Sequence, residues 1–588
     1  MEKIMNRMQM KWSIAAIGLL LNITVSAQGF LKTAGERIVN EKGENVLLRG
    51  VGLGGWMLQE GYMLRINNEG QQYRIRQRIE QLLSKEQTQE FYDTWLANHT
   101  RRIDINSMKA WGFNSVRLPM HYNLYTLPVD EEPVAGNNTW LEKGFAITDS
   151  LLAWCKANQV YLILDLHAAP GGQGNDLNIS DRDPSKPSLW QSEANQQKTV
   201  ALWRKLAERY AGEPWIGGYD ILNEPNWGFT DSLDRNGLKE KSNAPLRRLL
   251  MDITKAIREV DQRHMIIIEG NGWGNNYNGM LPVWDKNMVL SYHKYWNNNN
   301  EEDIRHILNT RREQQVPVWL GETGENSNTW FAQAVELLEK NNIGWAWWPL
   351  KKLGANNPLE IPSNHNYNNL VDYWNGRRPN PPKESDVYSG LLELATYARL
   401  ESNIIHRDVI DALIRQPHTT ATIPFKQHVI TANTVIKAAD YDLGRNGYAY
   451  ADQDTANYRI STGKASTGNR GHTYRNDGVD IFQDSSRYNR FYVGQTEPGE
   501  WMQYTIEVKK KAKYKLLAEM AAIAPGRISI LVDDKVVLEN KEVPVTGSYT
   551  SWRETALGLI ELDKGVHRLQ VKIAEGGFNL LQLRFAAP

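Results

Sequence analysis

The chain reads Tyr219-Asp-Ile-Leu-Asn-Glu-Pro225 and, further on, Val316-Pro-Val-Trp-Leu-Gly-Glu-Thr323. Each stretch is a short apolar run that ends at a carboxylate, Glu224 in the first and Glu322 in the second. A proline or a glycine follows each glutamate within two residues and stops the run. The two stretches therefore predict buried strands that each carry an acidic side chain at the carboxyl end.

Similar apolar runs recur between residues 36 and 350, and together they predict eight strands. The predicted strands are Val46–Val51, Ser115–Pro119, Val160–His167, Gly218–Asn223, Met265–Glu269, Met288–His293, Val316–Gly321 and Ile343–Trp348. Amphipathic stretches such as Thr88–Trp111 separate most of them. This alternation predicts a (β/α)8 barrel, which we assign to residues 30–415. A doubly wound sheet is the rival fold, but no glycine-rich phosphate turn follows the first strand.

Side chains at the carboxyl ends of barrel strands face the site in folds of this kind. Here those positions carry Arg117, His167, Asn223, Glu224, His293, Tyr295, Glu322 and Trp348. Two carboxyl groups about 5–5.5 Å apart can cleave a glycosidic bond with retention, because one attacks carbon while the other protonates the leaving oxygen. Their surroundings must then push the two pKa values apart. Arg117 would keep Glu322 ionised, Tyr295 could donate a hydrogen bond to it, and the two histidines would line the cleft as donors.

Composition limits the kinds of partner that the chain can have. It has 588 residues, with 68 basic and 68 acidic side chains and no long run of one sign. This balance argues against nucleic acid and against a polybasic membrane surface as partners. The 21 Trp and 25 Tyr residues suit sugar rings, whose C–H faces stack on aromatic side chains. We find no His/Cys spacing typical of zinc, and we expect a monomer that needs no metal or cofactor for catalysis.

The first 27 residues resemble a secretory signal peptide. Lys3, Arg7 and Lys11 precede an apolar stretch from Trp12 to Val25, and small residues precede Gln28. The apolar stretch is too short for a spanning helix, so we expect export to a periplasm or to the medium without a membrane span. The single cysteine lies in an amphipathic pattern and is interpreted as buried filler.

The pattern changes after the last predicted barrel strand. Residues 353–385 are rich in Asn and Pro and predict a long irregular loop, and Val387–Arg415 predicts a helix. Residues 416–434 read as a linker. From residue 435 to 588 two-residue alternation dominates, as in Trp501–Val508, which predicts an all-β, jelly-roll-like sandwich.

The barrel motifs resemble glycoside hydrolase family 5 over residues Asn45 to Leu350. They are Val116-Arg-Leu-Pro119, Asp165-Leu-His167, Asn223-Glu-Pro225, His293-Lys-Tyr295, Gly321-Glu322 and Trp347-Trp348. The resemblance implies that Glu224 is the acid/base and Glu322 the nucleophile. It also implies that the other strand-end residues form a sugar-binding shell.

A finer resemblance concerns the substrate. Leu48-Arg-Gly-Val-Gly-Leu-Gly-Gly-Trp56 with Glu60, and Asp165-Leu-His-Ala-Ala-Pro-Gly171, are similar to motifs of the exo-acting β-1,3-glucanases of that family. This implies that Glu60 holds a terminal glucose. The chain departs from that group at Gln59-Glu60-Gly61, where the usual pattern is apolar-Glu-Pro, so exo action and linkage are left open.

The C-terminal segment resembles carbohydrate-binding module family 6. The match lies in Tyr474-Arg-Asn-Asp-Gly-Val-Asp-Ile481, Val493-Gly494, Gly499-Glu-Trp501 and Gly577-Phe-Asn579. It implies a sugar cleft that includes Trp552 and Asn579, although Gln495 stands where the first aromatic is usual. A structural calcium is implied too, but its usual glutamates are replaced in Ile436-Lys-Ala-Ala439, which puts the ion in question.

The sequence therefore predicts an exported retaining β-glycosidase that hydrolyses β-glucan, with a β-1,3 linkage expected. An endo-acting β-1,4-glycanase of the cellulase, mannanase or xylanase type is the first alternative, because loop residues decide the sugar. A non-catalytic glycan-binding protein is the second, although it predicts that one of the two glutamates is missing.

Overall fold

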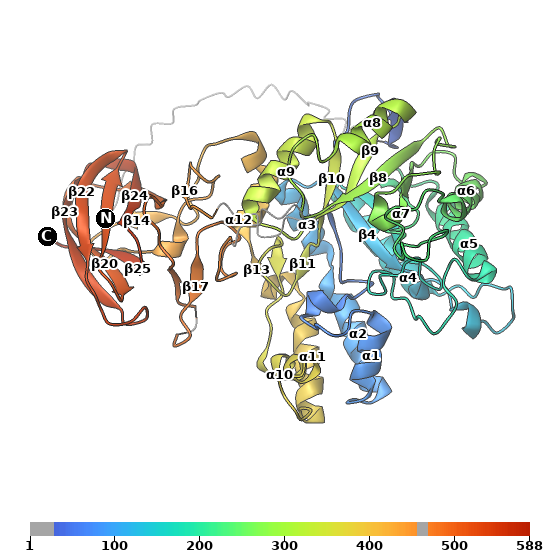
Figure 1. Ribbon diagram of the computed structural model, residues 1–588, viewed down its shortest axis with the longest axis horizontal. Helices are drawn as coiled ribbons and strands as arrows, with labels where there is room; N and C mark the ends of the chain where they lie inside the picture. Colours follow the sequence, from blue (N-terminus) through green and yellow to red (C-terminus); the bar gives the residue numbers. More distant parts are fainter. Residues whose placement is uncertain (1–28, 455–467, 488) are drawn as a thin grey trace, which may run out of the picture.

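The computed structural model describes residues 29–454, 468–487 and 489–588, which form a large barrel domain and a β-sandwich beside it (Figure 1). The signal peptide predicted for residues 1–27 lies outside the described residues. Within the described part of the chain, no helix combines the length and the apolar character needed to cross a bilayer.

Eight parallel strands close into a barrel in the order β10-β3-β4-β5-β6-β7-β8-β9. They are β3 (Arg49–Gly52), β4 (Ser115–His121), β5 (Tyr161–Ala168), β6 (Ile216–Asp220), β7 (Ile266–Glu269), β8 (Met288–Lys294), β9 (Val318–Gly324) and β10 (Gly344–Trp348). Each strand overlaps one of the eight predicted apolar runs, and nearly every residue of the eight strands is buried. Strands buried on both faces read as continuous apolar segments, and for this reason the barrel was predictable. The predicted (β/α)8 fold is confirmed.

The helices lie between the barrel strands and after β10, most of them against the outside of the barrel (Figure 1). They are α1 (Gln72–Glu80), α2 (Lys85–His99), α3 (Arg102–Trp111), α4 (Glu142–Asn158), α5 (Glu193–Tyr210), α6 (Ala244–Arg258), α7 (Asn271–Gly274), α8 (Arg305–Gln314), α9 (Asn328–Lys340), α10 (His365–Trp374), α11 (Glu384–Tyr397) and α12 (Arg407–Ile414). The single helix predicted for Thr88–Trp111 is two helices, because Thr100 has an extended backbone that ends α2.

A second, smaller apolar core joins α1, α2, α10 and α11 into a helical lobe below the barrel in Figure 1. The prediction of an irregular loop over residues 353–385 is wrong, since α10 lies within it. Asn364 caps this helix by accepting a hydrogen bond from the backbone N of Tyr367 at 2.8 Å, so one of its asparagines starts the helix and does not mark a loop. The helix predicted from Val387 to Arg415 is likewise divided into α11 and α12.

The C-terminal domain consists of two six-stranded sheets packed face to face. One sheet contains β14 (His428–Ile430), β16 (Tyr450–Ala451), β19 (Trp501–Val508), β21 (Gly526–Val532), β22 (Lys535–Val543) and β24 (Gly565–Glu575). The other contains β15 (Val435–Lys437), β17 (Ile481–Gln483), β18 (Phe491–Val493), β20 (Ala512–Ala522), β23 (Arg553–Leu562) and β25 (Phe578–Ala586). The predicted sandwich is confirmed. The predicted linker 416–434 is too long, because β14 already pairs with β19 inside the first sheet.

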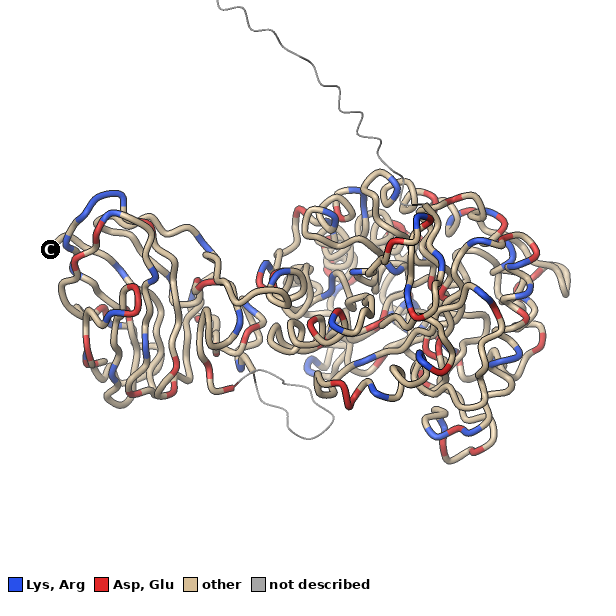
Figure 2. The backbone as a smooth tube through the Cα atoms, turned by 90° about the horizontal axis from the view of Figure 1, so that it is seen from above, with Lys and Arg blue, Asp and Glu red and all other residues tan. Residues whose placement is uncertain are grey.

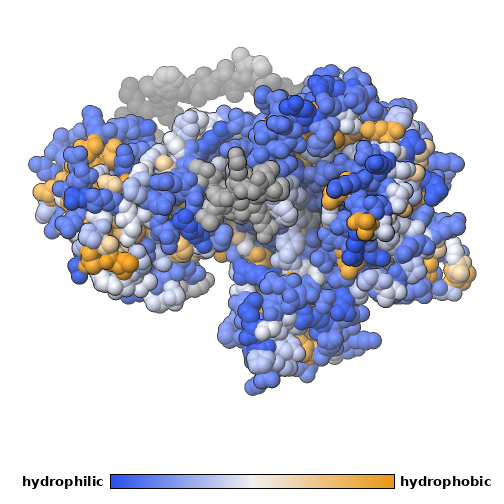
Figure 3. All heavy atoms as spheres, viewed as in Figure 1, coloured by the Kyte–Doolittle hydropathy of each residue, from blue (hydrophilic) through white to orange (hydrophobic). Residues whose placement is uncertain are grey.

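The surface matches the balanced composition. Basic and acidic residues are interspersed along both domains (Figure 2). The face shown in Figure 3 is mostly hydrophilic, with small separate apolar patches.

Candidate active site

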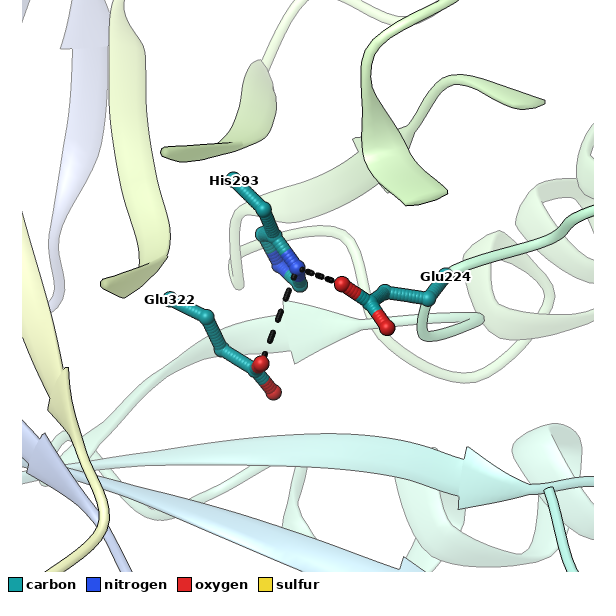
Figure 4. A group of neighbouring side chains, drawn as sticks. All are labelled: Glu224, His293 and Glu322. Carbon is teal, nitrogen blue, oxygen red and sulfur yellow. Dashed lines mark hydrogen bonds and ion pairs between the residues drawn. The ribbon is translucent and has the colours of Figure 1, made fainter. Parts of the chain in front are cut away.

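The two predicted glutamates meet at the carboxyl ends of β6 and β9. Glu322 is part of β9, whereas Glu224 lies four residues beyond β6 on a backbone with φ 40°. An oxygen of Glu224, an oxygen of Glu322 and a ring nitrogen of His293 all lie within 4.8 Å of one another. His293 Nδ1 is 2.6 Å from Glu224 Oε1 and 3.7 Å from Glu322 Oε2 (Figure 4). Carboxyl groups this close can act on a single bond from opposite sides.

Arg117 lies at the floor of the site and binds four carboxylates, none of them more than 3.2 Å away. Its nearest nitrogens are 2.5 Å from Glu322, 2.9 Å from Asp220, 3.1 Å from Glu269 and 3.2 Å from Asp165. The Arg117 side chain is fully buried and does not line the cleft. Its guanidinium instead holds Glu322, to which Nη1 donates a hydrogen bond within an ion pair.

A second group of side chains forms the wall beside Glu322. His167 stacks on Trp348 with ring centroids 5.2 Å apart, and its Nδ1 lies 2.8 Å from Asp165 Oδ2. Asn223 is fully buried, and its Oδ1 accepts a hydrogen bond from Arg117 Nη2 at 2.7 Å. These contacts fix the orientation of the wall before any ligand arrives, which lowers the entropic cost of binding.

Burial and the neighbouring charges shift the pKa values of the titratable groups of the site in different directions. Burial raises the pKa of Glu224, and the negative charge of Glu322 adds to this, although His293 opposes both. Burial opposes protonation of His293, but Glu269, Glu322 and Glu224 outweigh it and raise its pKa well above the ordinary value. The pKa of Glu269 is lowered despite its burial, because His293 and Arg117 lie beside it. The site thus contains Glu224, a carboxyl group of raised pKa, close to Glu322, which is hydrogen-bonded to the guanidinium of Arg117.

A cleft of about 1040 Å³ opens above the two glutamates. Seven of the nine predicted barrel residues line it, namely Glu60, His167, Glu224, His293, Tyr295, Glu322 and Trp348. Tyr295 Oη donates a hydrogen bond to Glu322 Oε2 at 3.2 Å. Glu60 precedes the short 3-10 helix η1 (Gly61–Leu64), and burial together with the charge of Glu322 raises its pKa well above the ordinary value.

The sequence analysis missed several residues of the site. Asp220 and Glu269 bind Arg117 from β6 and β7, and Glu269 Oε2 also accepts a hydrogen bond from the backbone N of Glu224 at 2.7 Å. Glu269 ends the apolar run Ile266-Ile-Ile-Glu269, which is the same signal that identified Glu322. The cleft is also lined by Tyr62, Asp176, Trp273, Trp296 and Glu325. Tyr62 lies in the short 3-10 helix η1 and Trp273 in the four-residue helix α7, and the other three lie on loops, where apolar periodicity gives no signal.

In the sandwich, Trp552 directly precedes β23 and Asn579 lies in β25, and these two strands belong to the same sheet. Trp552 meets the edge of Tyr492 at a centroid distance of 5.1 Å, and Arg490 lies 5.4 Å from its ring centroid. Asn579 is buried, and its Nδ2 donates to the backbone O of Tyr549 at 2.8 Å. A sugar role for these two residues stays a prediction.

Two family models match the chain. Residues 78–354 match cellulase (glycosyl hydrolase family 5), and residues 471–587 match carbohydrate binding module (family 6). Both resemblances are confirmed, and they fall on the barrel and the sandwich respectively.

Curated relatives align at low identity. The β-xylosidase of Phanerodontia chrysosporium is 25% identical over 373 residues, which cover 56% of this chain and 73% of that protein. Endoglucanase C of Acetivibrio thermocellus is 27% identical over 42% of this chain and 57% of its own length. The glucan 1,3-β-glucosidase of Candida oleophila is 27% identical over 43% of this chain and 59% of its own length. The alignments thus span less than two thirds of the last two proteins.

Proposed function

Because the barrel is a glycoside hydrolase domain of family 5, we propose that this protein is a retaining β-glycosidase acting on β-1,3-linked glucan. The observation that carries the proposal is the approach of Glu224 and Glu322, whose nearest oxygens lie within 4.8 Å. This agrees with the separation of about 5–5.5 Å that retention requires, and an inverting enzyme needs about 6.5–9.5 Å to admit a water molecule.

In the first step, a Glu322 oxygen attacks the anomeric carbon and forms a glycosyl ester. The bond to the leaving oxygen breaks, and this oxygen takes the proton of Glu224. Burial raises the pKa of Glu224, which favours the protonated form that this step needs. Arg117 and Tyr295 hold the two oxygens of Glu322 in place for the attack.

In the second step, Glu224 acts as a base. It takes a proton from a water molecule, whose oxygen attacks the anomeric carbon and releases Glu322 as a carboxylate. His293 contacts Glu224 at 2.6 Å and lies 3.7 Å from Glu322, so it can follow the charge as it moves between them. The anomeric configuration is inverted twice and so retained overall.

Two observations support β-1,3-glucan as the substrate. The opening motif Leu48–Trp56 is similar to that of exo-acting β-1,3-glucanases, and Glu60 lines the cleft as that resemblance implies. One aligned relative is named glucan 1,3-β-glucosidase. The carboxyl oxygens of Glu60 in the cleft can accept hydrogen bonds from the hydroxyls of a sugar.

We further propose that the sandwich binds polysaccharide through Trp552 and Asn579 and that the protein is exported as a monomer. Support comes from the match to the binding-module family and from the signal-like residues 1–27. The proposal includes no cofactor for catalysis.

The test is turnover by Glu322→Gln and by the wild-type chain on an aryl β-glucoside and on laminarin. We expect the variant to lose turnover, because an amide cannot form the glycosyl ester. A variant that keeps a substantial fraction of the rate would reject Glu322 as nucleophile. Products from a panel of β-1,3-glucan, cellulose, mannan and xylan then identify the substrate, and preference for a β-1,4 polymer would reject the proposed linkage.

A further inference from the structure

The turn that follows Glu322 is covered by the sandwich. Residues 325–328 lead from β9 into α9, and Glu325 lines the cleft. The sandwich turn 475–477 packs against this segment, and the backbone N of Asn328 donates to the backbone O of Asn476 at 2.9 Å. Figure 1 shows α9 and α12 on the side of the barrel that faces the sandwich. The module thus touches the segment that directly follows β9, the strand that contains the proposed nucleophile.

Buried side chains join the two domains at this point. Asn476 Nδ2 donates to the backbone O of Asn326 at 2.9 Å and to Asn328 Oδ1 at 3.2 Å. Asn328 Nδ2 donates to Asp477 Oδ1 at 2.9 Å and to Asp408 Oδ2, in α12, at 2.8 Å. None of these five residues is more than 6% exposed. Hydrogen bonds shielded from water in this way are strong, and breaking one leaves a buried polar group unsatisfied.

The sandwich side of this contact is itself rigid. Arg475 Nη2 lies 2.7 Å from Asp477 Oδ2, and its guanidinium carbon lies 3.7 Å from the ring centroid of Tyr441. The Tyr441 hydroxyl also donates to Asp477 Oδ2 at 3.1 Å. Arg475 and Tyr441 thus orient the Asp477 carboxylate that accepts the hydrogen bond from Asn328.

On the barrel side, the turn after β9 contains a residue with an unfavourable backbone conformation that neighbouring contacts must stabilise. Glu325 has φ 52°, in the left-handed region that side chains other than glycine seldom adopt. Residues in this region persist where their surroundings determine them, and the contacts of Asn326 and Asn328 come directly after Glu325. Glu325 also acts on the cleft, since its charge helps burial and Glu322 to raise the pKa of Glu60. A shift of this turn would move two carboxylates of the cleft.

We propose that Asn476 of the sandwich is a positioning residue for the barrel, because it fixes the turn after β9 and with it the placement of Glu322 and Glu325. The sandwich then acts as part of the catalytic frame in addition to any role in holding polysaccharide. This inference rests on the proposed glycosidase function.

The test uses the full chain with Asn476→Ala, and its matched control is Glu336→Ala. Glu336 lies in α9 and makes a half-exposed interdomain ion pair with Arg445 at 3.0 Å, away from the turn. The substrate is a small soluble aryl β-glucoside, which has no need of a separate binding module. The rate of trapping by a 2-deoxy-2-fluoro-β-glucosyl fluoride reports the attack by Glu322 alone. Thermal melts show which variants fold.

We expect Asn476→Ala to lower kcat and the trapping rate in parallel by about tenfold, since misplacing reacting groups by about 1 Å can cost a hundredfold. Glu336→Ala should match the wild type. If Asn476→Ala melts below the assay temperature, Asn476→Ser is the smaller truncation and must slow the same step. An Asn476 variant that folds and keeps both wild-type rates overturns the inference. A wild-type chain that neither turns over nor is trapped overturns the proposed function first.

Discussion

Arg117→Met removes the guanidinium that four buried carboxylates share. Its nitrogens lie between 2.5 and 3.2 Å from Asp165, Asp220, Glu269 and Glu322, and the side chain is fully buried. Methionine fills much of the same space without a charge. The substitution therefore tests whether the floor of the site depends on this cation.

The expected loss of stability follows from the geometry. Removing one partner of a buried ion pair costs about 3–5 kcal/mol, because the other charge stays buried without compensation. Burial raises the pKa values of Asp165 and Asp220, so these two groups take up protons most readily and limit the loss. We expect about 4 kcal/mol at pH 8, or roughly 5 °C in the melting temperature of a domain of this size. The loss should shrink as the pH falls and the carboxylates become protonated.

Calorimetric melts of the full chain at pH 8 and pH 5 measure this effect. Arg49→Met is the control, because Arg49 makes a two-nitrogen pair with Glu339 at 2.7 Å but is 39% exposed in its side chain. A pair of this exposure is worth about 1 kcal/mol or less. If Arg117→Met melts within a degree of Arg49→Met at both pH values, the charge of Arg117 does not stabilise the four buried carboxylates as argued.

Three further predictions concern the catalytic steps and the module. Glu224→Ala should slow aryl glucosides with poor leaving groups by about 10²–10⁴ and those with good leaving groups far less, and equal losses would refute its role as acid. Because the pKa of Glu224 is raised, the basic limb of the kcat/KM profile should lie above the ordinary value of 4.5. Activity should be retained at pH values below that limb and lost as the pH rises through it. A limb at or below 4.5 contradicts this prediction. Trp552→Ala should weaken retention on insoluble β-glucan roughly tenfold in a pull-down assay while leaving kcat on an aryl glucoside unchanged, and undiminished retention would place sugar binding elsewhere.

The barrel was readable from the sequence because its strands are buried on both faces. Each strand is a continuous apolar run, and a polar residue at its carboxyl end interrupts the run at the place where the site begins. Glu224, Glu322, His167 and His293 were all found by this signal, and the structure places them around one cleft. The family motifs added the implied roles of the two glutamates, which the apolar pattern does not contain.

The missed features have a different physical origin. Asp220 lies inside an apolar run and is fully buried, so its role depends on Arg117, which comes from a strand two places away in the barrel. The helix α10 was hidden because asparagine marks both loops and helix starts, and only packing against the helical lobe distinguishes them. The contact between Asn476 and the turn after β9 joins residues 150 positions apart in sequence, which local patterns cannot reveal.

The arrangement of cations explains how two similar carboxyl groups come to differ. Glu322 receives a guanidinium nitrogen at 2.5 Å, and the charge of Arg117 is permanent at any pH at which the protein folds. Glu224 faces His293, whose positive charge is shared with Glu269 and Glu322. Burial and the charge of Glu322 raise the pKa of Glu224, and the opposing effect of His293 offsets them only in part. The proposed roles of Glu224 as acid and Glu322 as nucleophile thus depend on the supporting residues, since the two glutamates are chemically identical.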